Sequence, residues 1–149
     1  MGLLHDPDER ARRLERADAA IGFALREAPT EHLWFLHAAL EKRQVARVVR
    51  GTWGGPEGLT CPLTALVWGS APTSDDEARE AAIRAEDLLR AHGHTARDFY
   101  GPWDAGLIPS WWLLRRVDRE ITRRTLRRGR GRAASVRHAA TPPARRRLR

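Results

Sequence analysis

The chain has 149 residues, of which 42% are hydrophobic, and this is enough for one small globular domain with its own core. Its single cysteine, Cys61, excludes an internal disulfide and indicates a reducing, cytoplasmic location. Acidic residues from Asp6 onward exclude a secretory h-region, and no run reaches the roughly 18 apolar residues that a spanning helix needs. We therefore expect a cytoplasmic protein that does not associate with membranes.

The formal net charge of +8 is unevenly distributed along the chain. No acidic residue follows Glu120, whereas residues 121–149 contain eleven arginines. The residues before them therefore carry a slightly negative net charge. A GC-rich genome explains why arginine is used in place of lysine, but it does not explain why the acidic residues stop. The functional alternative is that the C-terminal charge faces a polyanionic partner.

Helix-start and helix-stop signals divide most of the chain into long helical segments. Asp6 and Pro7 form a strong helix start, and Pro29 ends that segment because the residue before a proline avoids the α conformation. Ser74 and Glu77 form a second capping box. The predicted long helices cover residues 7–28, 31–50, 75–92 and 111–128. The second of these is apolar most of the way round and is expected to be the central helix.

The stretch 53–69 lies between these helical pairs and begins as a loop, because three glycines and Pro56 break any regular period there. The apolar run 62–68 is predicted as a short helix, since a lone strand has no obvious partner. A second short helix is predicted at 95–103, capped by Thr95. The sequence therefore predicts an all-α fold: a single small helical bundle of four long helices plus short helices, spanning residues 1–128.

Residues 129–149 form a basic, arginine-rich tail. This tail has few apolar residues, two prolines and no acidic residue, so we expect it to be disordered when alone. Four arginines recur at a spacing of four residues from Arg115 to Arg127 and lead into the tail. We expect this surface to contact the phosphates of nucleic acid, or another acidic macromolecular partner, without reading bases. The candidate nucleic-acid-binding residues are Arg115, Arg119, Arg123, Arg124, Arg127, Arg128, Arg130, Arg132, Arg137, Arg145, Arg146, Arg147 and Arg149.

Cys61 is the sharpest candidate for catalysis. The sequence Thr60-Cys61-Pro62 places its sulfur at a helix N-terminus, where the dipole and free amide groups lower the pKa of a thiol. A nucleophile also needs a base, and the histidines that could supply one are His32, His37, His92 and His94. The alternative is that Cys61 caps the helix or packs as a small apolar residue, as free cysteines commonly do.

Other motifs favour structural roles. His92-Gly93-His94 is at most half of a metal site, and a histidine that caps a helix C-terminus is the simpler interpretation. The glycines of the central loop lack the Gly-Lys-Ser/Thr of a phosphate loop, so neither a metal nor a cofactor is predicted. Several of the six tryptophans are expected to clamp loops onto helices, although an exposed pair at Trp111 and Trp112 would indicate a protein partner.

The layout Trp53-x-Gly, then Cys61-Pro-Leu-Thr-Ala-Leu, then Trp103-Asp104 resembles that of small helical bacterial proteins. Those proteins carry W-x-G, C-x-L-G-A-L and W-N-D motifs. Two positions depart from the pattern: Thr64 stands in place of the glycine, and the asparagine is missing. The resemblance implies an all-α fold and assigns no chemistry.

Three functions are compatible with these patterns. The first is a small helical binding or accessory protein whose arginine-rich C-terminus contacts nucleic acid or another polyanion without sequence readout. The second is a small enzyme that depends on Cys61. The third is a scaffold or phage-type structural component that docks by its tail.

Overall fold

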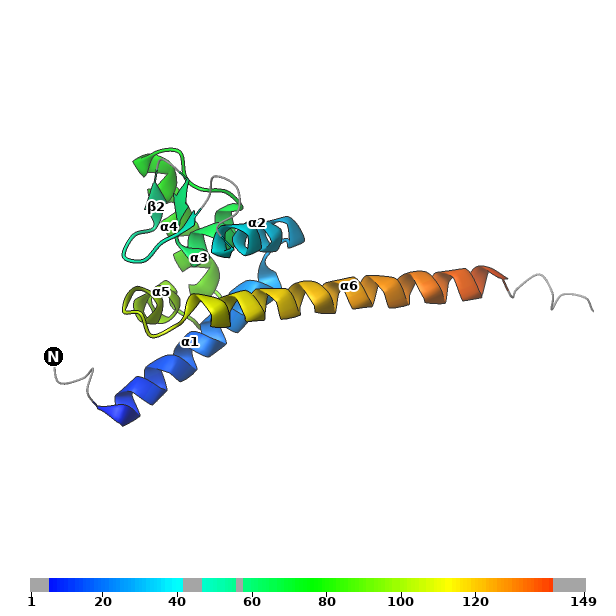
Figure 1. The fold of residues 1–149 in the computed structure, drawn as a ribbon, viewed down its shortest axis with the longest axis horizontal. Coiled ribbons are helices and arrows are strands. Elements are labelled where there is room, and N and C mark those ends of the chain that lie inside the picture. Colours follow the sequence, from blue (N-terminus) through cyan, green and yellow to red (C-terminus); the bar gives the residue numbers. More distant parts are fainter. Residues whose placement is uncertain (1–5, 42–46, 56–57, 141–149) are drawn as a thin grey trace, which may run out of the picture.

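The computed structural model shows an all-α fold. Six helices pack together within the part of the chain that the structure describes (Figure 1). The structure describes residues 6–41, 47–55 and 58–140, apart from the side chains at 47, 55 and 132–140. The helices are α1 (Pro7–Glu27), α2 (Thr30–Leu40), α3 (Pro62–Trp68), α4 (Asp75–Arg90), α5 (Ala96–Asp104) and α6 (Ser110–Ala140). The prediction of four long helices and further short ones is thus confirmed.

Local capping signals set most helix starts as expected. The Asp6 carboxylate accepts a hydrogen bond from the backbone amide of Asp8 at 2.9 Å, and Ser74 accepts one from Glu77 at 3.2 Å. Thr95 caps α5 by accepting from the amide of Asp98 at 3.1 Å. Each side chain satisfies an amide that has no partner within the helix, which explains why short-range sequence signals place these starts.

The second predicted helix is too long: α2 ends at Leu40, not near Arg50. Part of the expected helix instead forms β1 (Arg47–Val48), which joins β2 (Gly54–Gly55) and β3 (Leu59–Thr60) in a small sheet of order β1-β3-β2. The β1 strand pairs with β3 in parallel, and β2 pairs with β3 in antiparallel orientation. Strands of two residues are too short to show an alternating pattern, so the sequence did not predict this sheet.

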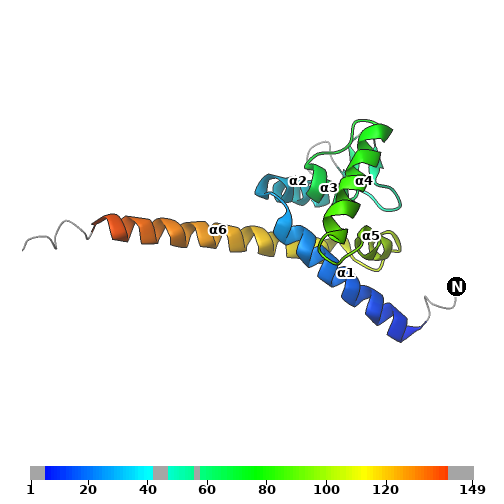
Figure 2. The same cartoon turned by 180° about the vertical axis from the view of Figure 1, so that it is seen from behind.

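The core lies where α1 meets α5 and where α2 meets α3 and α6, while α4 covers α3 (Figures 1 and 2). Its largest fully buried side chains are Trp103, Phe99, Ile21, Leu33 and Leu36. Alanines dominate the buried face of α4, as expected from the sequence, with Ala81 and Ala85 fully buried. Within the described ranges, no helix is both long and apolar enough to cross a bilayer.

The last helix continues far beyond the body (Figures 1 and 2). Val117 and Ile121 are still buried, but every residue from Thr125 to Gly131 is exposed. Helix α6 was expected to end near Arg128 and instead continues to Ala140, because arginine and alanine favour helix and two interior glycines cost only about 1 kcal/mol each. Residues 125–140 therefore form a projecting arm of about 24 Å, at 1.5 Å per residue.

Candidate functional site

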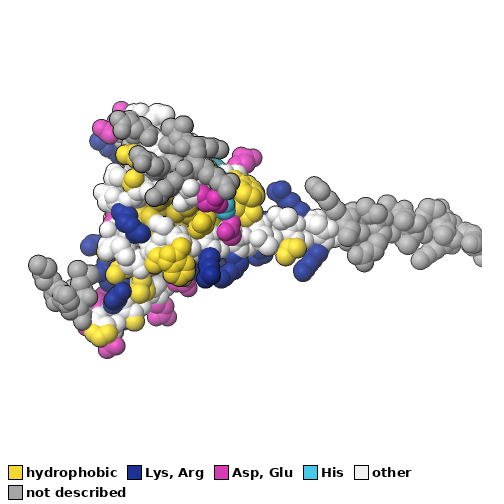
Figure 3. Space-filling model, in the orientation of Figure 1, with side chains coloured by type: hydrophobic (Ala, Val, Ile, Leu, Met, Phe, Trp, Pro, Cys, Tyr) yellow, Lys and Arg dark blue, Asp and Glu magenta, His cyan; other side chains and the backbone are white. Residues whose placement is uncertain are grey.

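The projecting arm carries exposed arginines that have no acidic neighbour in sequence. Arg127, Arg128 and Arg130 are all exposed, and no ion pair is formed by them with another described residue. Arg132 and Arg137 continue the arm as part of α6, with side chains outside the described set. The remaining candidates, Arg145, Arg146, Arg147 and Arg149, lie outside the described residues. Figure 3 shows basic side chains along α6 where the helix leaves the body.

Arg124 occupies a different position from these arginines, because it faces the body. Its guanidinium donates to the backbone carbonyls of Leu25 at 2.9 Å and Arg26 at 3.0 Å, which are at the C-terminal end of α1. It also donates to the Thr30 hydroxyl at 3.0 Å and to the Glu120 carboxylate at 2.9 Å. Arg124 therefore ties α6 to the junction of α1 and α2, and its side chain is only 17% exposed.

Glu120 is the acidic partner within this junction. Burial opposes ionisation of its carboxylate, but hydrogen bonds from Arg123 and Arg124 outweigh that effect and lower the pKa of Glu120. Arg123 donates to it at 2.5 Å, and this hydrogen bond raises the pKa of Arg123. Arg123 nevertheless remains about half exposed, at 45%, so its positive charge faces the surface.

Arg115 and Arg119 lie on α6 alongside the body. The Arg115 guanidinium lies 5.5 Å from the ring centroid of Trp111, within the range of a cation–π contact. Arg119 is exposed and forms no ion pair with a described residue. It lines a groove between α1 and α6, so two of the predicted arginines, Arg119 and Arg123, come together at one place.

This groove has a volume of about 480 Å³ and is lined by residues of both helices. We call it the basic groove; its polar and glycine lining consists of Asp18, Gly22, Arg26, Arg116, Arg119, Glu120 and Arg123. A Cβ atom placed on Gly22 would lie 3.1 Å from Nη2 of Arg116 and 3.2 Å from Nη1 of Arg26. The missing side chain at Gly22 thus leaves room for two guanidinium groups from different helices.

Sequence reasoning missed Arg26 and Arg116 as parts of this site. Arg26 belongs to the first helix and Arg116 lies off the spacing-of-four stripe, so no periodic signal links them. Arg116 forms an ion pair with Asp18 and lies over the ring of Trp112, 5.0 Å from its centroid. Only the packing of α1 against α6 brings these residues together.

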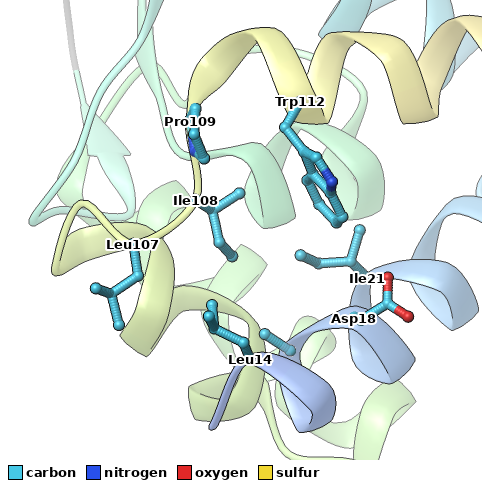
Figure 4. Close-up of a pocket in the computed structure, with 8 residues that line it drawn as sticks. Leu14, Asp18, Ile21, Leu107, Ile108, Pro109 and Trp112 are labelled. Carbon is cyan, nitrogen blue, oxygen red and sulfur yellow. The ribbon is translucent and has the colours of Figure 1, made fainter. Parts of the chain in front are cut away.

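An apolar cavity of about 230 Å³ adjoins the basic groove (Figure 4). Its lining comes from three parts of the chain: Leu14 and Ile21 of α1, Leu107 and Ile108 of the loop before α6, and Trp112 of α6. Asp18 lines both hollows and therefore marks their border. We call this hollow the Trp112 cavity.

Cys61 caps α3, as its position in the sequence indicated. Its sulfur accepts from the amide of Thr64 at 3.3 Å and lies 3.2 Å from the Thr64 hydroxyl. The residue is only 2% exposed, and burial raises the pKa of the thiol despite these hydrogen bonds. Hydrogen bonds at the helix N-terminus lower the pKa of the thiol, but desolvation of the thiolate is the larger effect, and this matches the alternative in which Cys61 caps the helix and packs as a small apolar residue. None of the four candidate histidines forms a hydrogen bond with the Cys61 sulfur within the described residues.

The histidines occupy structural positions. His92 lies with Nδ1 3.1 Å from the Leu88 carbonyl near the end of α4, and both His92 and His94 pack against Phe23. His32 contacts the Leu66 carbonyl at 2.7 Å, and His37 lies 2.6 Å from the Asp118 carboxylate. Within the described part of the chain, no group of three or more His, Cys, Asp or Glu side chains is arranged to hold a metal ion.

Three residues of the tryptophan and cysteine motifs noted in the sequence, Trp53, Trp103 and Asp104, lie in or against α5. The Trp103 indole donates to the Val49 carbonyl at 2.9 Å, and Asp104 accepts from the amide of Gly51 at 2.8 Å. Trp53 packs edge-on against Tyr100, with ring centroids 5.2 Å apart. These residues therefore fasten the sheet-bearing loop to α5, which agrees with the expectation that tryptophans clamp loops onto helices.

Trp111 and Trp112 differ in environment. Trp111 is 60% exposed, whereas Trp112 is partly buried and packs against the core. Of these two residues, only Trp111 is exposed at the protein surface, so the expected exposed pair does not form.

Comparisons of the chain with protein families, curated proteins and solved structures find no match.

Proposed function

We propose that this protein binds nucleic acid electrostatically through the arginines of α6, as a small helical binding or accessory protein. The observation that carries this proposal is the projecting arm, where Arg127, Arg128 and Arg130 are exposed on a helix segment without an acidic residue. Arginine binds phosphate bidentately, and a helix held clear of the body is accessible from all sides.

Surface charge elsewhere on the protein is balanced differently. On α4, Arg84 lies 2.9 Å from Glu80, and Arg90 is paired with Glu86. Arg79 lies 4.0 Å from Asp76 on the same helix. The arm differs from this ordinary helix surface because Arg127, Arg128 and Arg130 form no ion pair among the described residues, so their charge is available to a polyanion.

The test compares two triple variants for binding to a short RNA and a short DNA duplex across a salt series. Arg127→Gln/Arg128→Gln/Arg130→Gln removes three charges from the arm. Arg79→Gln/Arg84→Gln/Arg90→Gln removes the same charge from α4, where all three side chains are exposed, and serves as the matched control. Because each phosphate contact contributes about −0.9 to the slope of log K against log salt for duplex, loss of three contacts makes the slope less negative by about 2.7.

The control variant is expected to retain the slope of the natural protein. If both triple variants bind equally, the arm has no special role and the proposal is wrong. A protein partner with acidic residues is the competing interpretation, and affinity purification with and without nuclease separates the two. Partners that remain after nuclease treatment, together with no affinity for either oligonucleotide at about 50 mM salt, would favour docking into a protein assembly.

A further inference from the structure

The basic groove and the Trp112 cavity are neighbouring hollows along α1, and Asp18 lines both of them. We refer to the two hollows together as the depression. Leu14, Ala17 and Ile21 line the apolar end, and Gly22, Leu25 and Arg26 line the basic end. The two sets are centred about seven residues apart on α1, which is a separation of about 10 Å along the helix axis. A ligand that occupies both ends needs an apolar or aromatic group and, about two helical turns away, an anionic group.

The basic end has an excess of positive charge. Four arginines line it, but only Asp18 and Glu120 oppose them, and these carboxylates are held by Arg116 and by the Arg123–Arg124 pair. Arg26 and Arg119 have no acidic partner among the described residues. Like charges held in one groove repel each other unless an anion lies between them, so a bound oxyanion relieves this repulsion.

Gly22 gives the basic end its space. The position is helical and buried, so the glycine is not required by backbone conformation. Its missing side chain instead leaves the guanidinium groups of Arg26 and Arg116 close together, because each would lie within 3.2 Å of a Cβ atom at this position. Two guanidinium groups held close together from two helices offer donors for the oxygens of a phosphate group.

The Trp112 cavity suits a flat ring. Its volume of about 230 Å³ is below the roughly 300–1,000 Å³ of pockets that enclose a drug-sized ligand, so it accepts one ring-sized group. The Trp112 indole forms one wall and faces Leu14 and Ile21 across the cavity (Figure 4). Unpaired bases stack on aromatic side chains in this manner, whereas paired bases are not available to do so.

We propose that this depression holds one unpaired nucleotide of a nucleic-acid strand, with its phosphate at the Gly22 groove and its base beside Trp112. This inference rests on the proposed nucleic-acid function and extends it to a preference for single strands. The strand continues from Arg119 and Arg123 toward Arg127 and Arg130, because these residues follow one another along α6. The arm supplies affinity without selectivity, and the depression selects unpaired nucleotides.

The test measures affinity for a short single-stranded DNA, a duplex of the same sequence, and an abasic strand with the same number of phosphates. The natural protein is expected to bind the single strand about tenfold more tightly than the abasic strand, since stacking of one base is lost. Arg119→Gln is expected to weaken single-strand binding about tenfold and duplex binding much less, because it removes a charged phosphate contact. Arg115→Gln is the matched control on the same helix, and it should weaken both probes by the same small factor.

Two further variants probe the ends of the depression separately. Gly22→Glu places a carboxylate between the arginines and is expected to reduce single-strand affinity at least as much as Arg119→Gln. Trp112→Leu is expected to abolish the preference for the base-bearing strand over the abasic one. Arg119 is exposed, so Arg119→Gln keeps the inference testable even if a variant at Gly22 or Trp112 does not fold.

The outcomes separate this inference from the proposed function. If the triple variant of the arm loses binding while Arg119→Gln behaves like Arg115→Gln, the depression is not a nucleotide site and the arm proposal stands. If neither the triple variant of the arm nor Arg119→Gln weakens binding, both the arm proposal and this inference are wrong. Equal affinity for base-bearing and abasic strands would show that no base stacks beside Trp112. A nucleoside monophosphate that binds as tightly as the strand overturns the strand as the ligand and identifies a free nucleotide instead.

Discussion

Arg124 offers the clearest test of which arginines on α6 hold the fold and which are free. Arg124→Met removes four hydrogen bonds, to Glu120, Thr30 and the carbonyls of Leu25 and Arg26, but retains an apolar stem of similar length. We expect this variant to unfold more readily than the natural protein. The carbonyls concerned are at the C-terminal end of α1, where no intrahelical donor is available.

The magnitude follows from the contacts that are lost. A hydrogen bond that involves a charged group contributes about 1.5–3 kcal/mol, so the four bonds set an upper limit well above the net effect. Water reaches part of the site, since the side chain is 17% exposed, and Glu120 retains Arg123 as a partner. We therefore expect a loss of about 3 kcal/mol in the free energy of unfolding. For a chain of this size, that loss corresponds to a decrease in Tm of roughly 6–12 °C.

The assay is thermal and urea unfolding followed by far-UV circular dichroism. Arg127→Met and Arg128→Met are matched controls on the exposed arm, and each should change the free energy of unfolding by less than about 0.5 kcal/mol. The reasoning is refuted if Arg124→Met melts with the natural protein. A variant that keeps full stability yet loses nucleic-acid affinity like the arm variant would show that Arg124 faces the ligand.

Further predictions concern Gly54 in the central loop and Cys61 at the start of α3. Gly54→Ala should cost about 2–3 kcal/mol in urea unfolding, because φ is +120° and a Cβ would lie 2.6 Å from the Leu59 carbonyl oxygen. Gly129→Ala, where a Cβ would meet open space inside α6, should not destabilise the protein, since alanine favours the helix over glycine by about 1 kcal/mol. Cys61 should react slowly with thiol reagents at neutral pH, and rapid labelling would contradict its burial. Burial raises the pKa of Cys61 in the folded state. The protonated thiol therefore contributes fully to the free energy of unfolding below the unfolded-state pKa of about 8.5, and this contribution is lost as pH rises through the folded-state pKa. Cys61→Ser should lack this decline in stability at alkaline pH.

Helix starts were predictable from the sequence because their causes are local. Asp6, Ser74 and Thr95 each cap an amide two or three residues away, and Cys61 caps α3 in the same way. Such interactions depend on neighbours in the chain and not on the rest of the fold. The same local logic failed for β1 (Arg47–Val48), which was expected to be helical and instead pairs with β3 in a sheet.

The candidate site was likewise predictable only where its cause is local in the sequence. An acid-free, arginine-rich C-terminus is a property of composition, and the sequence alone was sufficient to identify it. The basic groove was not predictable, because Arg26 and Arg116 are remote in sequence and meet only where α1 packs against α6. The Trp112 cavity has the same origin, since its walls come from α1, α6 and the loop before α6.

The contrast between sequence and structure is clearest for Arg123, Arg124 and Arg127. In sequence they are equivalent members of one basic helix, and each was an equal candidate for phosphate contact. In the structure Arg124 faces the α1–α2 junction, Arg123 is shared between Glu120 and the surface, and Arg127 is free of the body. Charge and helical periodicity were fixed by the chain itself. Which arginines remain available for a ligand was decided by tertiary packing, because a guanidinium that donates most of its N–H groups to the body has few left for a phosphate.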